Sequence, residues 1–479
     1  MPRRLLRLRA DGGLLRARFA AIRDELGVPD GFSSPVLAEA EAATSAAAGV
    51  SGVPGGPAAP EDRTDLPLLT IDPPGSMDLD QALHLQRHGR GYRVHYAIAD
   101  VATFVRPGGA IDAEAHRRAE TIYAPDERAP LHPPALSEGA ASLLPGQVRP
   151  AVLWTIDLDA DGELIGADLR RALVRSRQRW DYEAVQRGVD AGDERWALLG
   201  EIGRLRLARE VERGGVDLPI PEQEVVPSGA GFALAYRTVV PAERWNAQIS
   251  LLTGIAAARL MVAGRVGVLR TLPAAPNGRT ELLRRTASAL GIDWPAGDTF
   301  AELVHSLDPA RPEVAAFVQE ATSLLRGAGY VSFDGELPPE HEHAAVASVY
   351  AHVTAPLRRL VDRYATECCL ALVEGRDVPE WVRARLAELP KTMAVGDQLA
   401  ARLERACLDA VEAAVLAGAV GRVFPAVVVE VREGGGVVQL REPAVRARCD
   451  GEALPLGELV DARLVEADVQ TGTVRFALA

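Results

Sequence analysis

Residues 70–82 read TIDPPGSMDLDQA, and they bring three aspartates close together in the chain. Asp72 ends an apolar run, and the Pro-Pro-Gly after it cannot continue a strand, so the chain must turn there. Asp78 and Asp80 are two residues apart, so an extended backbone points both carboxylates to the same face. If the turn folds back, we expect the three carboxylates to meet at one point.

The spacing of these acids alone supports two interpretations. Three carboxylates within about 4 Å of each other repel by roughly 4 kcal/mol per pair at an effective dielectric constant near 20, so they require a cation, raised pKa values or separation. Hard divalent cations such as Mg²⁺ prefer oxygen ligands of this kind. The order of residues does not fit an EF-hand, and a solvated or capping turn would explain the same acids. Both interpretations stay open on spacing alone.

The composition is that of an ordinary globular protein. The chain has 479 residues, 48% apolar and 25% charged, which suggests about three domains. No apolar run reaches the ~18 residues of a membrane span, so we expect no membrane association. The Arg-rich N-terminus lacks the apolar core of a secretory signal. Four cysteines without CxxC spacing predict free thiols in a reducing cytoplasm: Cys368, Cys369, Cys407 and Cys449.

The charged residues give no general argument for nucleic-acid binding. The net charge is −13, so any basic surface must be local. Lys391 is the only lysine among 53 basic residues, so phosphate contacts would come from forked guanidinium groups. Seven arginines lie among the first 23 residues, either as a solvated helix face or as an arm that attracts polyanions.

The chain divides into three sections. Residues 1–60 predict a helical arm, with helices at 14–27 and 34–49 and a Gly/Pro-rich linker at 50–60. Residues 61–416 predict a mixed sheet with many helices. Its expected strands are a buried strand at 66–71, a hairpin at 81–100 and two strands around an Asp-Gly turn at 149–176. Its expected helices are 112–122, 195–213, 244–263, 342–353, 357–375 and 394–420.

Residues 417–479 contain five short strand patterns at close spacing, which predict a small all-β barrel of the OB type. The fold class is therefore α+β. Barrels of this type bind single-stranded nucleic acid through aromatic platforms and basic grooves. This segment has only two aromatic residues, Phe424 and Phe476. We therefore expect either a barrel that binds the nucleic-acid backbone or one that is a spacer.

TIDPPGSMDLDQA resembles the signature of the ribonuclease II / ribonuclease R (RNB) exoribonucleases, in which a strand ends in T-I-D and a short turn leads to D-x-D-D. Further stretches resemble that family in the same order, and they are YAIADVATFVRPGGAIDAEAHRRAETIYAP, RPAVLWTIDLDADGEL, RSRQRWDYEAV, RGGVDLPIPEQEV and YAHVTAPLRRLVD. The series covers residues 65–416, and the barrel lies where the family carries its RNA-binding barrel. The resemblance implies an RNB-type catalytic domain, a mixed sheet surrounded by helices.

The resemblance implies a 3′-to-5′ exoribonuclease that hydrolyses single-stranded RNA to nucleoside 5′-monophosphates with Mg²⁺ or Mn²⁺. Asp72, Asp78 and Asp80 match the family's metal-binding and catalytic acids, and Gln81 stands at the position of a further metal ligand. A metal would polarise the scissile phosphate and generate the attacking hydroxide.

Four residues match the family's contacts with RNA. Arg358 matches the catalytic arginine that holds the phosphate, and Arg359 follows it. Tyr123 matches the aromatic residue beside the 3′-terminal nucleotide, and Tyr182 matches a tyrosine that lines the RNA path. Without the resemblance, the tyrosines read as core aromatics and the arginines as ordinary surface residues.

Several positions depart from the family pattern. Gln81 replaces a fourth aspartate, Gln248 lies where an acid pair is usual, and Ala355 and Leu360 replace Ser and Tyr. About 60 residues precede the nuclease section, so we expect a short form without N-terminal cold-shock barrels. These departures keep two alternatives open, a catalytically weak or inactive RNA-binding relative and another Mg²⁺-dependent phosphodiesterase. No protein partner can be deduced.

Two further groups of residues need an assignment. His341, His343 and His352 have the residue type of a zinc cluster, but no second group of ligands is evident. Asp100 and Asp362 lie in motifs shared with the family, and we expect structural hydrogen-bonding roles for both.

Overall fold

The computed structural model describes residues 12–47, 60–218, 223–228, 231–237, 239–275, 278–308 and 311–479. The predicted linker lies outside the described residues except for its last position. The first four of the seven N-terminal arginines and part of the RGGVDLPIPEQEV stretch also lie outside them.

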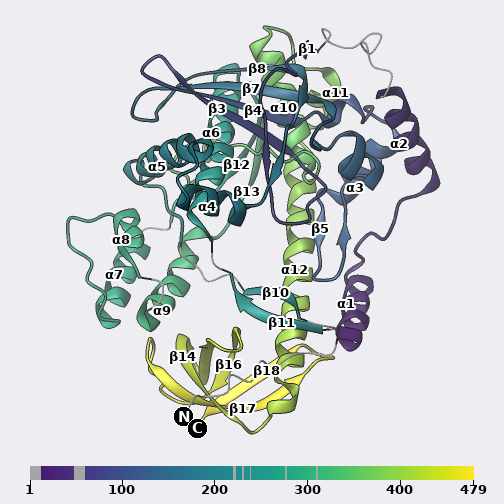
Figure 1. The fold of residues 1–479 in the computed structure, drawn as a ribbon. Helices are drawn as coiled ribbons and strands as arrows, with labels where there is room; N and C mark the ends of the chain where they lie inside the picture. Colours follow the sequence, from purple (N-terminus) through teal and green to yellow (C-terminus); the bar gives the residue numbers. More distant parts are fainter. Residues whose placement is uncertain are drawn as a thin grey trace.

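The central element is a five-stranded sheet in the order β1-β8-β7-β4-β3 (Figure 1). The predicted hairpin at 81–100 is confirmed as β3 (Gln81–His88) and β4 (Gly91–Ala99), which pair in antiparallel register. The predicted strand–turn–strand is confirmed as β7 (Val148–Leu158) and β8 (Leu164–Arg175). Short β1 (Glu61–Asp62) adds in parallel to β8.

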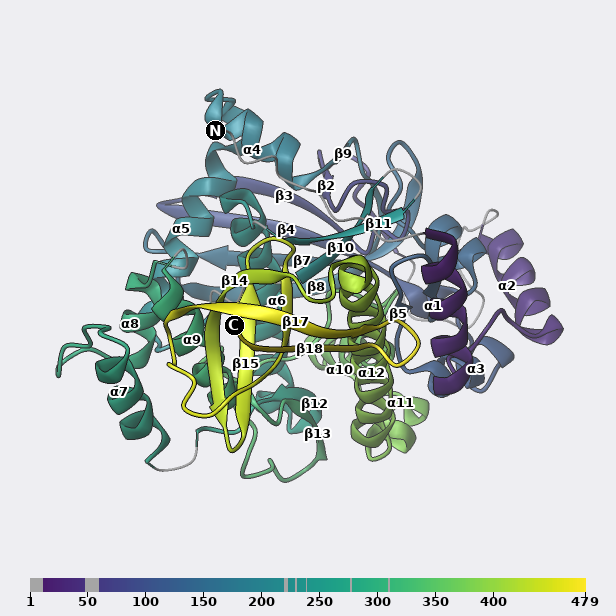
Figure 2. The ribbon, with the colours of Figure 1, turned by 90° about the horizontal axis from the view of Figure 1, so that it is seen from below.

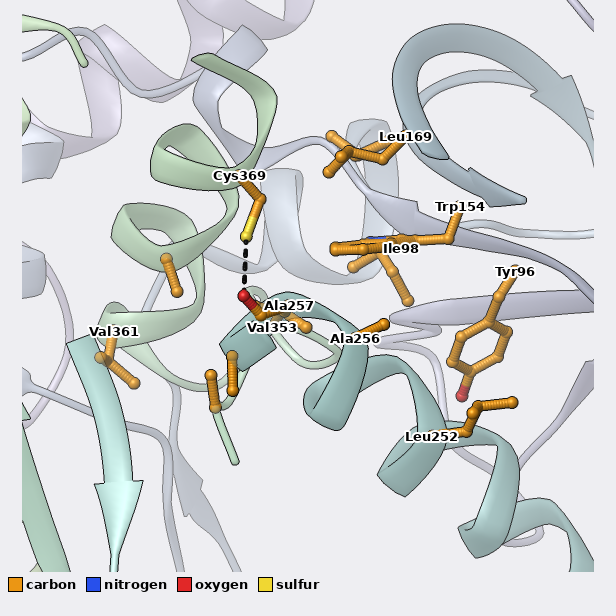
Figure 3. Close-up of a cluster of buried hydrophobic side chains, with 14 of the residues drawn as sticks. Tyr96, Ile98, Trp154, Leu169, Leu252, Ala256, Ala257, Val353, Val361 and Cys369 are labelled. Atoms are coloured by element: carbon orange, nitrogen blue, oxygen red, sulfur yellow. Dashed lines mark hydrogen bonds between the residues drawn. The ribbon is translucent and has the colours of Figure 1, made fainter. Parts of the chain in front are cut away.

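Helices cover one face of this sheet and enclose the main core. α6 (Pro241–Gly264) packs beside α10 (Leu360–Val373), and Figure 3 shows side chains from the sheet, α6 and α10 meeting there. Tyr96 and Trp154 from the sheet are at most 1% exposed. Cys369 on α10 donates to the Ala257 carbonyl of α6 at 3.6 Å. All four cysteines are free thiols, as predicted.

Helix α6 is the one described helix that is long and apolar enough to cross a membrane by length and composition. Buried core helices of soluble proteins meet the same test, and 56% of the apolar window of α6 is buried inside the protein. The position of α6 under the sheet explains its apolar sequence.

The predicted C-terminal barrel is confirmed as a closed barrel in the order β14-β15-β16-β18-β17. Its strands are β14 (Val423–Arg432), β15 (Gly435–Leu440), β16 (Val445–Asp450), β17 (Leu459–Asp468) and β18 (Thr473–Leu478). The 28-residue helix α12 (Leu389–Leu416) runs from the section that contains the five-stranded sheet to the barrel and packs on β17 and β18 (Figures 1 and 2). The expected α+β organisation is therefore confirmed.

The N-terminal helices lie along one side of the molecule (Figure 2). α1 (Gly12–Leu26) packs on α12, with Leu15, Phe19 and Ile22 buried. α2 (Ser34–Ala47) packs on α3 (Ala110–Arg118), and Glu39 accepts the backbone N–H of Ala110 at 2.5 Å.

Two predicted helices differ from the structure. Residues 342–353 form a turn rather than a helix, because their backbone bonds to distant segments: Ala344 donates to the Leu272 carbonyl and Ala351 to the Gly254 carbonyl. The helix predicted at 112–122 ends at Arg118, where Ala119 takes a φ of 63°, and the chain then forms β5 (Ile122–Tyr123). The predicted strand at 66–71 is confined to β2 (Thr70–Ile71).

One buried acid ties α12 to the barrel and to the hairpin of β10 (Gln223–Ser228) and β11 (Gly231–Tyr236). Glu412 is 2% exposed, and its Oε1 accepts the Gln223 side-chain amide at 2.6 Å and the backbone N–H of Arg446 at 2.9 Å. Burial raises the pKa of Glu412 to about 7, although the Arg446 bond opposes the shift.

This raised pKa predicts a pH-dependent stability. Between pH 4.5, the ordinary pKa, and about 7, the folded protein keeps a proton that the unfolded chain releases, so the free energy of unfolding falls as pH rises. Glu412→Gln keeps the acceptor oxygen and removes this titration. We expect the variant to gain on the order of 2–3 kcal/mol over the wild type at pH 8 and little at pH 4.5, measured by urea unfolding. An equal gain at both pH values would contradict the assignment.

Candidate active site

The acidic stretch forms the turn that its sequence predicts. Asp72 follows β2, and its backbone N–H donates to the Trp180 carbonyl at 3.0 Å. Ser76 then closes a turn onto the Pro73 carbonyl, and Gly75 takes a φ of 85°, a conformation that favours glycine. Ser142 accepts the Leu79 N–H at 2.9 Å and donates to the Met77 carbonyl at 2.7 Å, which fixes the segment that leads into β3.

Asp80 is the most buried acid of this stretch, at 3% exposure. Its Oδ1 accepts the backbone N–H of Leu357 at 2.8 Å, and its Oδ2 lies 3.7 Å from Nε of Arg358. Burial raises the pKa of Asp80 to about 8, against the opposing effects of Arg358 and the Leu357 N–H. Asp80 therefore joins the acidic stretch to the loop before α10.

The charge of Arg358 acts on Asp72 as well as on Asp80. Burial raises the pKa of Asp72 to about 7, the positive charge of Arg358 lowers it, and the negative charge of Asp78 raises it. Its Oδ2 is buried and has no hydrogen-bond partner among the described residues. Arg358 therefore acts on both Asp72 and Asp80, and one oxygen of Asp72 remains for a further ligand.

Asp78 is held by a cation from another part of the chain. Its Oδ1 accepts Nη1 of Arg128 at 2.8 Å, and Nη2 of the same arginine lies 2.6 Å from Oε1 of Glu138. Among the described residues, no three His, Cys, Asp or Glu side chains are grouped to hold a metal ion. The structure therefore does not show the simple convergence of three carboxylates that the sequence suggested.

Gln81 is engaged through its amide nitrogen, which donates to the Thr354 carbonyl. The hydroxyl of Thr354 in turn lies 2.8 Å from the hydroxyl of Ser250 on α6. An aspartate at this position would have no donor for the Thr354 carbonyl. Gln81 thus contributes a structural hydrogen bond as well as an amide oxygen.

The two arginines of the APLRR stretch differ in their surroundings. Arg358 is partly exposed, and it lines a cavity of about 340 Å³ together with Tyr123. Arg359 lines the same cavity, but its guanidinium forms two 2.8 Å hydrogen bonds with Asp362. The remaining lining residues are Glu120, Thr121, Ala400 and Glu404. Arg358 is the arginine with freedom to bind a ligand.

The two candidate tyrosines occupy different environments. Tyr123 is 48% exposed, at the end of β5. Tyr182 begins α4 (Tyr182–Asp190) and is partly buried, and burial together with the nearby charge of Asp72 raises its pKa. Tyr123 has an accessible ring, whereas Tyr182 is partly buried and close enough to Asp72 to feel its charge.

The residues present fit a divalent cation of the Mg²⁺ type. Magnesium is usually bound by one or two carboxylates, with water and substrate phosphate completing its shell. Asp80 is buried and Asp72 is partly buried, the pKa values of both are raised, and Asp72 Oδ2 has no partner among the described residues. A cation would offset the cost of keeping these carboxylates charged, so a site with two acids suffices.

The other candidate groups have structural contacts. Asp362 accepts the Ala355 N–H at 2.7 Å, and Asp100 accepts Thr103 Oγ1 at 2.9 Å and Nε of Arg171 at 2.8 Å, in the structural roles that we expected. The three histidines are not part of any metal-binding group among the described residues. Gln248 donates to Glu210 at 2.6 Å inside the core.

Comparison with known proteins identifies the family. The RNB domain matches residues 61–373, more than half of the chain, and the RNase II-type exonuclease C-terminal S1 domain matches residues 422–479. The chain belongs to the RNB family. The acidic stretch, the arginine loop and the cavity beside them all lie within or next to its RNB domain.

Curated relatives share this domain at moderate identity. The chain is 30% identical to ribonuclease R of Escherichia coli over 327 residues, which is 63% of this chain and 39% of that protein. It is 26% identical to human exosome complex exonuclease RRP44 over 374 residues, which is 72% of this chain and 38% of that protein. The chain therefore spans well under half the length of these relatives.

Solved structures share the fold. Mycoplasma genitalium RNase R in complex with ribose methylated single-stranded RNA matches with a TM-score of 0.85 and 20% identity, over 97% of this chain and 78% of that one. Yeast Ssd1, described as a pseudonuclease, matches with a TM-score of 0.68 and 17% identity, over 84% of this chain and 51% of that one. These likenesses establish the fold, and they include a protein described as a pseudonuclease.

Sequence reasoning missed several residues around this RNB site. Arg128 pairs with both Asp78 and Glu138, and Glu120 and Glu404 line the cavity. Burial raises the pKa of Glu120 to about 7, and the negative charge of Asp397 adds to the shift. No local spacing signals these residues, because each reaches the site from a separate element.

The Asp362–Arg359 pair predicts a large effect on stability. Asp362 is fully buried, so Asp362→Ala leaves Arg359 and the Ala355 N–H without their partner. We expect a loss of about 3–5 kcal/mol in the free energy of unfolding, measured by urea denaturation. Asp334→Ala, which breaks an exposed pair with Arg383, is the matched control and should cost less than about 1 kcal/mol. Equal losses would show that Asp362 does not brace the loop.

Proposed function

We propose that this protein is a 3′-to-5′ exoribonuclease that hydrolyses single-stranded RNA to nucleoside 5′-monophosphates with Mg²⁺ or Mn²⁺. The observation that carries the proposal is the position of Arg358, beside buried Asp80 and on the wall of a cavity that also contains Tyr123. Ligand pockets of roughly 300–1,000 Å³ are usual, and about 340 Å³ suits a single nucleotide.

The residues of the chain have separate tasks in this reaction. Tyr123 offers an accessible ring for stacking on the terminal base, which tolerates any base because every base has a π face. Arg358 binds the scissile phosphate and stabilises the negative charge that develops on its oxygens. Asp80 holds the Leu357 N–H, so it fixes the backbone on which Arg358 stands.

Asp72 and Asp80, with the amide oxygen of Gln81, are the residues that would hold the divalent cation, and Asp78 joins them when it is free of Arg128. When bound, a divalent cation would supply Lewis-acid chemistry, in that it would polarise the phosphate and lower the pKa of an attacking water. The arginine-rich composition fits this substrate, because guanidinium groups bind phosphate in a forked geometry.

One alternative has specific support. The chain carries amides at Gln81 and Gln248, where the family that it resembles usually has acids. Its fold also matches a protein described as a pseudonuclease. A catalytically weak or inactive RNA-binding protein is therefore the second candidate. Asp72 and Asp80, both of which feel the charge of Arg358, favour the nuclease, because RNA binding alone gains nothing from carboxylates with raised pKa values.

The direct test uses 5′-labelled oligo(A) with Mg²⁺ or Mn²⁺. The wild type should shorten the RNA stepwise from its 3′ end. Asp80→Asn should lower the rate at least about a hundredfold, because it removes the charge that holds the cation and faces Arg358. Asp168→Asn, at an exposed ion pair on β8, is the matched control and should retain full activity.

Binding of oligo(A) without any shortening in either metal would refute the nuclease and favour the inactive relative. Immediate release of the labelled 5′-terminal nucleotide, without a ladder of shortened RNA, would refute the proposed direction. Equal loss of activity in both variants would show that the effect comes from folding rather than from the site.

We expect the wild type to need a high Mg²⁺ concentration for half-maximal rate, because the amide oxygen of Gln81 adds no negative charge to the site. Gln81→Asp should lower the Mg²⁺ concentration for half-maximal rate, measured by titration of the oligo(A) reaction. The variant should also lose about 1 kcal/mol of stability, because the Thr354 carbonyl loses its donor. Saturation of the wild type at low micromolar Mg²⁺ would contradict this prediction.

A further inference from the structure

The hairpin of β5 and β6 (Arg128–Ala129) presents two functional side chains together. Tyr123 and Arg128 are directly paired in its antiparallel register. Directly opposed residues of an antiparallel pair project from the same face of the ladder. The aromatic ring proposed for stacking and the guanidinium that binds Asp78 therefore face the same side.

Arg128 lies between two carboxylates, with Asp78 at 2.8 Å and Glu138 at 2.6 Å. Its side chain keeps 31% of its exposure, and those of Asp78 and Glu138 keep 15% and 28%. A guanidinium on Asp78 Oδ1 occupies an oxygen that a cation would need. Phosphate is an equally suitable forked partner for arginine. Glu138 remains as an anchor if Arg128 leaves Asp78.

The N-terminal helix holds this hairpin from the outside. Arg23 at the end of α1 pairs with Asp126 at 2.7 Å and with Glu127 at 3.1 Å, the two acids that precede Arg128. Arg23 thereby neutralises both loop acids, so Arg128 does not pair with them and instead binds Asp78. Arg23 is the last of the seven N-terminal arginines, and these two ion pairs show that it contacts the β5–β6 hairpin rather than projecting as a free cation.

We propose that Arg128 is a positioning residue that exchanges partners during substrate binding. It holds Asp78 before RNA binds, and it transfers to an RNA phosphate when the strand lies over Tyr123, which releases Asp78 toward the divalent cation. RNA and cation then strengthen each other's binding, because coupling between two ligands is reciprocal. This exchange rests on the proposed function, since it concerns the same acids.

The test measures Mn²⁺ binding to the full chain directly, by electron paramagnetic resonance of the free ion, with and without a hydrolysis-resistant phosphorothioate oligo(A). In the wild type, RNA should raise the Mn²⁺ affinity about tenfold, within the usual range of coupling between sites. Arg128→Gln should bind Mn²⁺ more tightly without RNA and should lose most of the RNA effect. Arg128→Lys, which keeps the charge without the fork, should retain part of it.

Arg170→Gln is the matched control, because Arg170 also bridges two carboxylates, Glu61 and Asp168, on the exposed end of the sheet. It should behave like the wild type. Arg23→Gln leaves Asp78 untouched and should weaken the coupling in the same direction as Arg128→Gln, so a poorly folded Arg128 variant does not remove the test.

Wild-type Mn²⁺ affinity in Arg128→Gln without RNA would overturn the exchange, and so would an unchanged RNA effect in that variant. Absence of Mn²⁺ binding by the wild type would overturn it as well. Coupling in a protein that never shortens RNA would support the exchange while refuting the nuclease, so the two proposals fail separately.

Discussion

The site depends on one buried hydrogen bond, from the Leu357 N–H to Asp80 Oδ1 at 2.8 Å. It joins the start of β3 to the loop before α10, segments that are 277 residues apart. Asp80 is fixed because its carbonyl accepts the Ala99 N–H of β4, and the loop is fixed because Asp362 accepts the Ala355 N–H. Arg358 follows Leu357, so the sheet and α10 together set the separation of the acid and the cation.

Ion pairing distinguishes the two adjacent arginines, Arg358 and Arg359, and it distinguishes the two aspartates Asp72 and Asp78 in the same way. Arg359 is neutralised by Asp362 through a forked pair, whereas Arg358 keeps a longer contact of 3.7 Å with Asp80. Asp78 is neutralised by Arg128, whereas Asp72 keeps a buried oxygen without a partner among the described residues. Arg359 and Asp78 are therefore held by ion pairs, whereas Arg358 and Oδ2 of Asp72 are left for the phosphate and the cation that we propose.

The sequence predicted what local pattern controls. Strand-like runs separated by turn signals located the β3–β4 hairpin, the β7–β8 pair and the barrel, because turn residues mark where antiparallel strands are joined. The helix predicted at 342–353 was wrong because distant contacts control this segment. Its backbone bonds to β12 (Val266–Thr271) and α6. In the site, the acids and Arg358 carried a motif. Arg128 belongs to no recognised motif. It is one of 53 basic residues, and nothing in its local sequence indicates that it reaches Asp78 from another hairpin.

The barrel adds to the site through packing rather than through an aromatic platform. Its two aromatic residues, Phe424 and Phe476, are 6% and 0% exposed and contact each other in the barrel core, with ring centroids 6.1 Å apart. Base stacking therefore cannot come from them. The barrel instead holds α12 through Glu412, and α12 carries Ala400 and Glu404 on the wall of the cavity beside Arg358. The barrel and α1 both pack on α12, so both constrain the position of the cavity wall that α12 forms.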